Sequence, residues 1–260
     1  MLWETNELLL LLIFLAGFLV AMEAGFRLGL RYSAVSGEPE KDHNSALQAA
    51  ILGLLALLLG FTFLMAVSRF DTRKALVLDE ANAIGTTFLR SKLLPAAQRD
   101  AAPGLLRSYV AARLTFHNAS NDRARLDAAN AEASRIEEQL WALSKAAAAQ
   151  DERSVTTGLF IQSLNEVIDT REKRQVALDN HVPEAVIYLL LAVSLAALGL
   201  LAYGCGLERK RRLPSNALFA LLIALVLTTI LDIDRPRRGL IEVSQDSMIR
   251  LKATLEQGAR

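Results

Sequence analysis

The chain has 260 residues, of which 52% are hydrophobic and 22% are charged. Its 29 Lys and Arg residues balance 28 Asp and Glu residues, so it lacks the positive field on which non-specific nucleic-acid binding depends. The single cysteine, Cys205, excludes an intrachain disulfide, and the three histidines lie too far apart in sequence to form a zinc motif. We therefore expect no nucleic-acid partner, no metal and no other cofactor.

Four charge-free apolar runs predict a membrane protein that crosses the bilayer four times. They cover residues 8–22, 46–67, 185–207 and 217–231. About 20 apolar residues cross a hydrocarbon core roughly 30 Å thick, so the second and third runs are long enough by themselves. The first and fourth runs reach that length with flanking residues such as Trp3 and Asn216, which suit the membrane interface. A secretory signal is an alternative for the first run, but Glu4 and Glu7 stand where a signal carries basic residues.

Residues 68–184, between spans two and three, are predicted to form an extramembrane domain of about four helices, so that the fold class is all-α. The helices are expected at residues 72–94, 102–117, 122–150 and 154–180. Pro95 ends the first helix, and Asp100 and Pro103 mark the start of the second. The third helix has apolar residues at intervals of three and four, which predict a seam for a partner helix: Leu126, Ala129, Ala133, Ile136, Leu140 and Leu143. Residues 232–260 are expected to form a polar tail.

Basic residues in the short loops predict the orientation, because short loops rich in Lys and Arg stay in the cytoplasm. Arg27, Arg31 and Lys41 lie between spans one and two, within residues 1–67. Residues 209–212 place four basic residues between spans three and four, within residues 185–231. This count favours the outer face for the central domain and both termini. Basic residues at 69–74, 171–174 and 235–238 flank the opposite ends of the spans and favour a cytoplasmic central domain instead.

Small residues repeat along span two. Ala49, Gly53, Ala56 and Gly60 are spaced by four, three and four residues, which puts them on one helical face. Such a face lets helix backbones approach closely in lipid. We expect it to pack against another helix of the same subunit or around the symmetry axis of a homo-oligomer.

A second face of span two carries Phe61, Met65 and Ser68, spaced by four and three residues. Apolar rings near the end of a span can close a pore by excluding water. These three residues are therefore candidate pore-lining positions. Contact with lipid or with the protein core is the alternative interpretation.

Charged residues gather where spans two and four end. Arg69, Asp71, Arg73, Glu80 and Asn82 follow span two, and Asp232, Asp234, Arg235, Arg237 and Arg238 follow span four. Ionisable residues at a membrane edge usually pair with one another, so these sets predict either a salt-bridged cluster or an ion vestibule. Asp79 and Glu80 are expected on a solvated helix face or in a ring that attracts cations.

The sequence carries no recognisable catalytic motif. It has neither a glycine-rich phosphate loop nor a nucleophile elbow. Scattered Asp and Glu pairs are too common to specify acid–base catalysis. We therefore expect no enzymatic activity.

Several motifs resemble the bestrophin-like family of bacterial membrane proteins. They are Leu59-Gly60-Phe61-Thr62-Phe63, Ser68-Arg69-Phe70-Asp71 with Arg73, Glu80-Ala81-Asn82-Ala83-Ile84-Gly85-Thr86, and Asp234-Arg235-Pro236-Arg237-Arg238-Gly239. Together they bracket spans two to four. A more distant similarity to bestrophins themselves lies in Phe70-Asp71 with Arg73 and in the acidic end of span four. The resemblance implies a location in the bacterial inner membrane.

The similarity to bestrophins further implies a homopentameric ion channel whose pore is lined by span two. It also implies a cytoplasmic central domain and cytoplasmic termini, opposite to the loop-charge prediction. No calcium clasp is recognisable, so ion selectivity does not carry over. We expect a homo-oligomeric, channel-like protein whose partners are lipid, ions and further copies of itself. The alternative is a membrane-anchored sensor or scaffold whose helical domain binds a partner protein or a small ligand.

Overall fold

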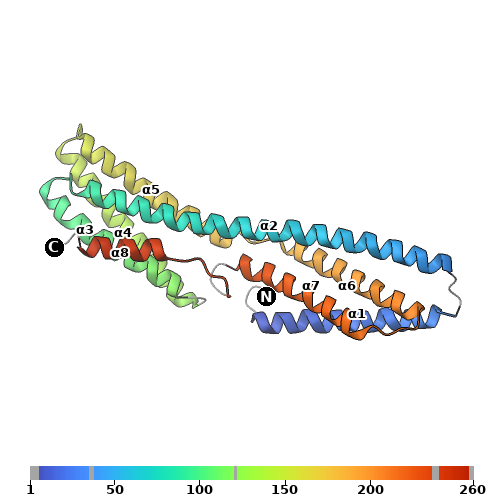
Figure 1. Cartoon of the computed structure of the whole chain (residues 1–260). Helices are drawn as coiled ribbons and strands as arrows, with labels where there is room; N and C mark the ends of the chain where they lie inside the picture. Colours follow the sequence, from blue (N-terminus) through green and yellow to red (C-terminus); the bar gives the residue numbers. More distant parts are fainter. Residues whose placement is uncertain (1–5, 35–37, 120–121, 236–239, 258–260) are drawn as a thin grey trace. The chain divides into compact units, whose positions relative to one another are not determined.

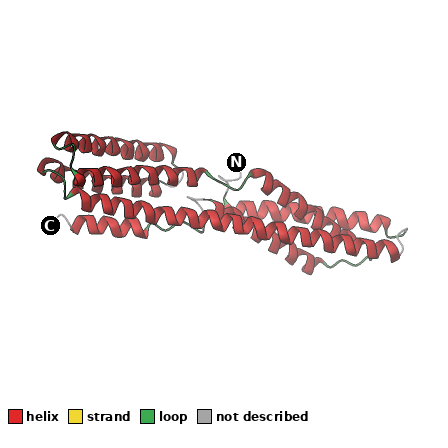
Figure 2. Cartoon of the chain, turned by 90° about the horizontal axis from the view of Figure 1, so that it is seen from above, coloured by secondary structure: helices red, strands yellow, loops and turns green. Residues whose placement is uncertain are grey.

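The computed structural model describes residues 6–34, 38–119, 122–235 and 240–257 (Figure 1). These residues form helices and no strand, as the colouring in Figure 2 shows. The helices are α1 (Glu7–Tyr32), α2 (Glu38–Ser91), α3 (Ala96–Asn118), α4 (Arg123–Gln150), α5 (Val155–Asp179), α6 (Glu184–Leu207), α7 (Leu213–Asp234) and α8 (Asp246–Gln257). The predicted all-α fold is confirmed for the described part of the chain.

The four predicted spans are confirmed as long apolar helices. They lie in α1, α2, α6 and α7, each of which is long and apolar enough to cross a membrane. Local signals fix where three of them begin. The side chain of Asn6 caps α1 by accepting a hydrogen bond from the backbone N–H of Leu8 at 2.9 Å. α6 begins after Pro183, and α7 has Pro214 in its first turn, where the missing N–H is tolerated.

The chain divides into two compact units. The first, which we call the membrane unit, contains Met1–Ser68 and His181–Arg235. The second, which we call the helical unit, contains Arg69–Asn180 and Pro236–Arg260. α2 is an unbroken helix that contributes its first part to the membrane unit and its second part to the helical unit.

Glycines bring α1 and α6 together inside the membrane unit (Figure 1). A Cβ atom added at Gly25 would lie 2.1 Å from the carbonyl oxygen of Gly199. One added at Gly206 would lie 2.4 Å from the carbonyl oxygen of Phe26. Both distances are far shorter than any van der Waals contact, so only glycine permits this backbone approach.

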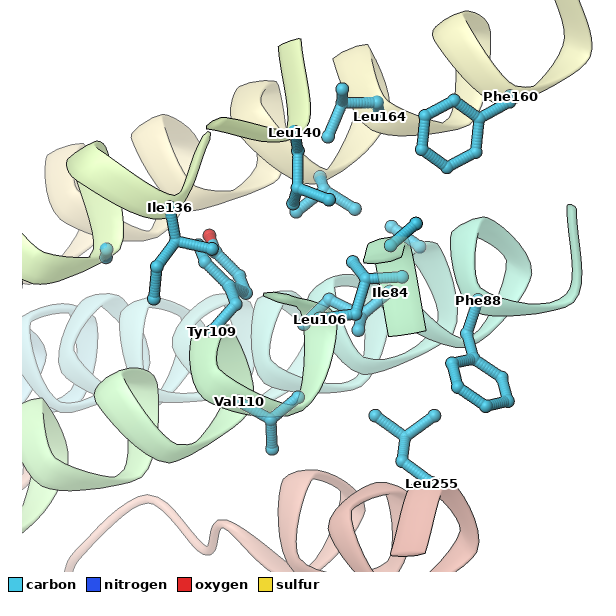
Figure 3. Close-up of a cluster of buried hydrophobic side chains, with 14 of the residues drawn as sticks. Ile84, Phe88, Leu106, Tyr109, Val110, Ile136, Leu140, Phe160, Leu164 and Leu255 are labelled. Atoms are coloured by element: carbon cyan, nitrogen blue, oxygen red, sulfur yellow. The ribbon is translucent and has the colours of Figure 1, made fainter. Parts of the chain in front are cut away.

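A large hydrophobic core and a smaller second cluster lie in the helical unit. Figure 3 shows the large core between α2, α3, α4, α5 and α8, with Ile84, Phe88, Leu106, Tyr109, Val110, Ile136, Leu140, Phe160, Leu164 and Leu255 labelled. The predicted seam of α4 is buried at Leu126, Ala129, Ala133, Ile136 and Leu140, and Leu143 packs half-buried against the core. Burial of apolar surface, at about 25 cal/mol per Å², is therefore what holds these helices together.

Three features differ from the sequence-based expectations. α2 continues past its apolar run to Ser91, so the predicted helix at residues 72–94 is the second part of α2. α3 begins at Ala96 with Pro95 as its N-cap residue, so Asp100 lies inside the helix and the prediction that it caps α3 is wrong. The predicted polar tail contains α8, which buries Met248 and Leu255 in the core of the helical unit.

Candidate functional site

One side of α2 is left uncovered by the other described residues. In its most apolar 18-residue window, 17% of the residues are buried, against 44% in the corresponding window of α7. Leu55, Thr62 and Ala66 lie on the covered side and are at most 3% exposed. Phe61 and Leu64 lie on the uncovered side and are 61% and 62% exposed. α2 therefore presents a wide apolar surface that no other helix in the described part of the chain covers.

The candidate pore-lining residues lie on this uncovered side or at its edge. Phe61 and Ser68 are exposed, and Met65 is 38% exposed. The interpretation of Phe61 as a core residue is wrong. The pore-lining interpretation and contact with lipid both stay predictions.

The small-residue face of α2 is also uncovered. Ala49, Gly53, Ala56 and Gly60 are all exposed, and a Cβ atom added at Gly53 or Gly60 would have no neighbour within 4 Å. Packing of this face against another helix of the same subunit, one of the two expectations, is therefore wrong. The close intrachain contact is made instead by the glycines of α1 and α6, which the sequence analysis did not single out.

The uncovered side continues along α2 into the helical unit, where its character becomes polar. Asp71, Asp79, Asn82 and Thr86 are exposed there. A cleft of about 400 Å³ between α2 and α5 is lined by Asp79 and Asn82 together with Arg90, Gln162, Ser163, Glu166, Thr170 and Lys173, among others. Acidic and basic side chains alternate in this cleft, so it has no strong net charge.

Glu80 lies on the opposite side of α2, at the centre of a buried ion-pair network. Its carboxylate is 0% exposed and accepts hydrogen bonds from Arg113 of α3, at 2.8 Å, and from Arg174 of α5. A solvated helix face and an ion-attracting ring, two of the interpretations of Glu80 from sequence, are wrong. The third, a salt-bridged cluster, agrees with its ion pairs, but the partners are Arg113 and Arg174 and not the predicted members of that cluster. A buried carboxylate between two guanidinium groups ties three helices together.

Tyr109 extends the network from Glu80 to α4. Its hydroxyl lies 3.3 Å from a carboxylate oxygen of Glu80 and 3.1 Å from one of Glu137, which is also 3.0 Å from Arg171. Burial raises the pKa of Tyr109 well above its ordinary value, so the hydroxyl keeps its proton. Burial also raises the pKa of Glu137, although Arg171 and the Tyr109 hydroxyl oppose that shift. Arg113, Arg174, Tyr109 and Glu137 were not identified from sequence.

Arg69 and Arg73 bind the end of α5. The Nε atom of Arg73 donates to the carbonyl oxygen of Ala177 and its Nη2 atom to that of Asn180, both at 2.9 Å. Arg69 donates to the side chain of Asn180. The last carbonyl groups of a helix lack partners inside the helix and carry partial negative charge, so these guanidinium groups stabilise the C-terminus of α5.

The charged residues that end α7 are buried in the membrane unit. Asp234 is 0% exposed, and its carboxylate accepts a hydrogen bond from the backbone N–H of Val182 at 2.8 Å and lies 3.5 Å from His181. Asp232 and Arg235 are 5% and 3% exposed. Arg237 and Arg238 lie outside the described residues. Asp234 therefore holds the start of the α6 segment against the end of α7, and the larger predicted cluster stays a prediction.

Comparisons with known proteins agree with this architecture. A crystal structure of a bacterial bestrophin homologue from Klebsiella pneumoniae, carrying one mutation, is 15% identical with a TM-score of 0.69, and the alignment covers 98% of this chain and 99% of that chain. Another structure of that homologue gives 17% identity, a TM-score of 0.66 and coverage of 97% and 98%. A crystal structure described as a membrane protein gives 18% identity, a TM-score of 0.66 and coverage of 98% and 96%. Identities this low show a shared fold alone.

No protein with curated annotation matches the chain. The family model described as the Bestrophin-like domain matches residues 9–248. That range contains all four candidate spans almost completely, the helical unit up to α5 and the start of α8. The match over nearly the whole chain confirms the resemblance noted from the sequence motifs, and the protein is a membrane protein that belongs to the bestrophin-like family.

Proposed function

We propose that the protein is a homo-oligomeric ion channel in which the uncovered side of α2 surrounds the pore. The proposal rests on one observation: the uncovered side runs along a single unbroken helix, first as an apolar surface and then as a polar one. It is apolar at Leu57 and Leu64, which are 55% and 62% exposed, and polar at Asp71, Asn82 and Thr86. Lipid could cover the apolar part but not the polar part, whereas a central axis that passes from membrane to water accounts for both.

Phe61 and Met65 would form the constriction of this pore. Phe61 is 61% exposed and lies one turn before Met65 on α2. Symmetry repeats each side chain around the axis, so one exposed phenyl group per subunit becomes an apolar ring. Such a ring opposes ion passage because water and ions are not stable in a narrow apolar passage. Ser68 follows where the same side of the helix becomes polar.

Asp71 and Asp79 would set the ion preference. Both are exposed on the uncovered side of α2, whereas the neighbouring Glu80 is bound to two arginines and cannot face an ion. Rings of carboxylates favour cations over anions at a pore mouth. The proposal is therefore a cation preference that depends on Asp79 and not on Glu80.

Ion flux into liposomes that contain the purified protein tests the proposal. Phe61→Ala and Met65→Ala should raise the flux above that of the wild type, because each removes apolar side-chain volume from the constriction. Leu189→Ala is the control, since Leu189 is 51% exposed on α6 and does not belong to the uncovered side of α2. Flux equal to that of empty liposomes for the wild type and all variants, under several ionic conditions, would refute the channel and favour the sensor or scaffold.

The oligomeric state in detergent provides an independent test. The proposal requires a closed ring of copies, in which cysteine residues introduced at Gly53 or Gly60 cross-link between subunits. A monomer or dimer with no such cross-links would refute it. The orientation in the bilayer is a separate question, because loop charge and the family resemblance place the helical unit on opposite sides. A reporter fused after the C-terminal residue would decide it: an outer signal agrees with the loop charges, and a cytoplasmic signal agrees with the resemblance.

A further inference from the structure

A polar cavity of about 250 Å³ lies in the membrane unit, between the start of α2, the end of α6 and the start of α7. Its lining includes Asn44, Gln48, Gly204, Glu208, Arg212 and Asn216. At roughly 30 Å³ per water molecule, this volume corresponds to about eight waters, so it can hold a small polar group. The cavity takes no part in the proposed pore.

Two side-chain amides inside the cavity have no partner among the described residues. Asn44 is 7% exposed, and no described residue hydrogen bonds to its amide or to that of Gln48, one turn further along α2. A Cβ atom at Gly204 would lie 2.8 Å from the Nδ2 atom of Asn44 and 3.7 Å from the Oε1 atom of Gln48. Gly204 therefore makes the room that the Asn44 amide occupies, whereas the distance to Gln48 is an ordinary van der Waals contact. A buried amide such as that of Asn44 normally finds a partner, so together with the half-buried Gln48 it indicates a ligand that both donates and accepts hydrogen bonds.

The two helix ends at the cavity carry opposite charge. Glu208 is the C-cap residue of α6, whose C-terminus has partial negative charge and favours a cation. Arg212 is the N-cap residue of α7, whose N-terminus has no side-chain cap and favours an anion. Glu208 and Arg212 lie 3.5 Å apart and both are largely exposed, so a ligand can exchange their weak mutual pairing for its own charges. A zwitterion matches this arrangement.

We propose that the cavity binds the headgroup of a zwitterionic phospholipid with a primary ammonium group, as in phosphatidylethanolamine. The phosphate lies at Arg212 and the start of α7, and the ammonium lies at Glu208. The side-chain oxygens of Asn44 and Gln48 accept the ammonium N–H groups, which a trimethylated choline group cannot donate. The cavity lies where the apolar runs of α6 and α7 end and begin, at the depth of lipid headgroups. Leu218 and Leu222, 58% and 50% exposed, continue along α7 as a surface for the acyl chains.

Thermal unfolding of the full-length protein in detergent, titrated with defined lipids, tests the proposal. Phosphatidylethanolamine should stabilise the protein at a concentration at least tenfold lower than phosphatidylcholine or phosphatidylglycerol requires. Glu208→Gln and Asn44→Leu should abolish this preference, whereas Lys210→Gln should keep it, because Lys210 lies in the same loop but does not line the cavity. Glu208 is on the exposed edge of the cavity, so its variant stays informative if Asn44→Leu does not fold. Native mass spectrometry should show phosphatidylethanolamine retained by the wild type and lost from Glu208→Gln.

Three results would overturn the proposal. Equal stabilisation by all three lipids would show that the headgroup is not recognised. Loss of the preference in Lys210→Gln as well would show general loop charge instead of the cavity. Stabilisation by soluble O-phosphoethanolamine at the same concentration as by the lipid would show a site for a water-soluble zwitterion and refute the lipid assignment.

Discussion

Replacing Glu80 with Gln should strongly destabilise the helical unit. The carboxylate is 0% exposed and lies between Arg113 and Arg174, which are 3% and 7% exposed. Gln keeps the shape of the side chain but removes its charge. Its amide group also turns N–H donors toward guanidinium groups that can only donate. Two buried cations would therefore lose their counter-charge.

The expected loss is about 3–5 kcal/mol, the usual cost of removing one partner from a buried ion pair. For a unit of this size, 1 kcal/mol corresponds to about 2–4 °C in melting temperature, so the shift should be roughly 6–20 °C. Asp79→Asn is the matched control, because it makes the same change at the neighbouring, exposed position. An exposed carboxylate contributes about 0–1 kcal/mol, and its loss should move the melting temperature by only a few degrees.

Melting of both variants in the same detergent, at one scan rate, provides the measurement, because membrane proteins often unfold irreversibly and the midpoint then depends on the scan. The double variant Glu80→Gln with Arg113→Met should recover part of the lost stability, because it removes one of the two buried cations that have lost their counter-charge. If Glu80→Gln melted within 2 °C of Asp79→Asn, the buried network would not carry the stability that its geometry implies, and the reasoning would be refuted.

Three further predictions concern other parts of the chain. Gly25→Ala should destabilise the membrane unit by about 1–3 kcal/mol, because its methyl group would meet the carbonyl oxygen of Gly199 at 2.1 Å. Gly53→Ala is the control: its methyl group has open space, so the melting temperature of the isolated subunit should stay unchanged or rise. The raised pKa of Glu137 means that the unfolded chain releases this proton before the folded chain does as the pH rises above the ordinary value of 4.5, so the wild type loses stability through that window. Glu137→Gln lacks this loss, so its stability relative to the wild type should increase as the pH rises above 4.5, as measured by melting at each pH. Asp79→Asn should lower the cation-to-anion permeability ratio in liposomes while leaving the fold intact, and an unchanged ratio would remove Asp79 from the pore.

The helices could be predicted because their signals are local. Charge-free runs set the four spans, and Pro95 and Pro183 separate helices where the ring of proline cannot continue one. α8 was missed although Met248, Leu251 and Leu255 repeat at intervals of three and four. A single short helix gives too few repeats to stand out from a polar tail, and its stability comes from packing on the core of the helical unit.

The buried network could not be predicted from spacing, because its partners are separated by long stretches of sequence. Arg113 and Arg174 bind Glu80 from 33 and 94 residues away. One signal was nevertheless present: Glu80 stands in the apolar repeat of Val77, Ala81 and Ile84, which are all buried. A charge inside an apolar repeat is costly unless it is paired, so it indicates a buried partner of opposite sign. The sequence does not say which of the 29 basic residues that partner is.

The covered side of α2 contributes to stability, and the uncovered side is the one assigned to function under the proposal. The covered side holds Arg73 and Glu80, which bind α5 and α3 and fix the helix in the helical unit. The other side is largely exposed among the described residues, from Gly53 through Thr86. An exposed apolar surface on a helix of this length needs either lipid or another protein surface, and the polar residues further along the same side exclude lipid as its only cover. One subunit therefore supplies a helix with a largely exposed surface, and under the proposed function that surface is covered only when copies of the chain close a ring.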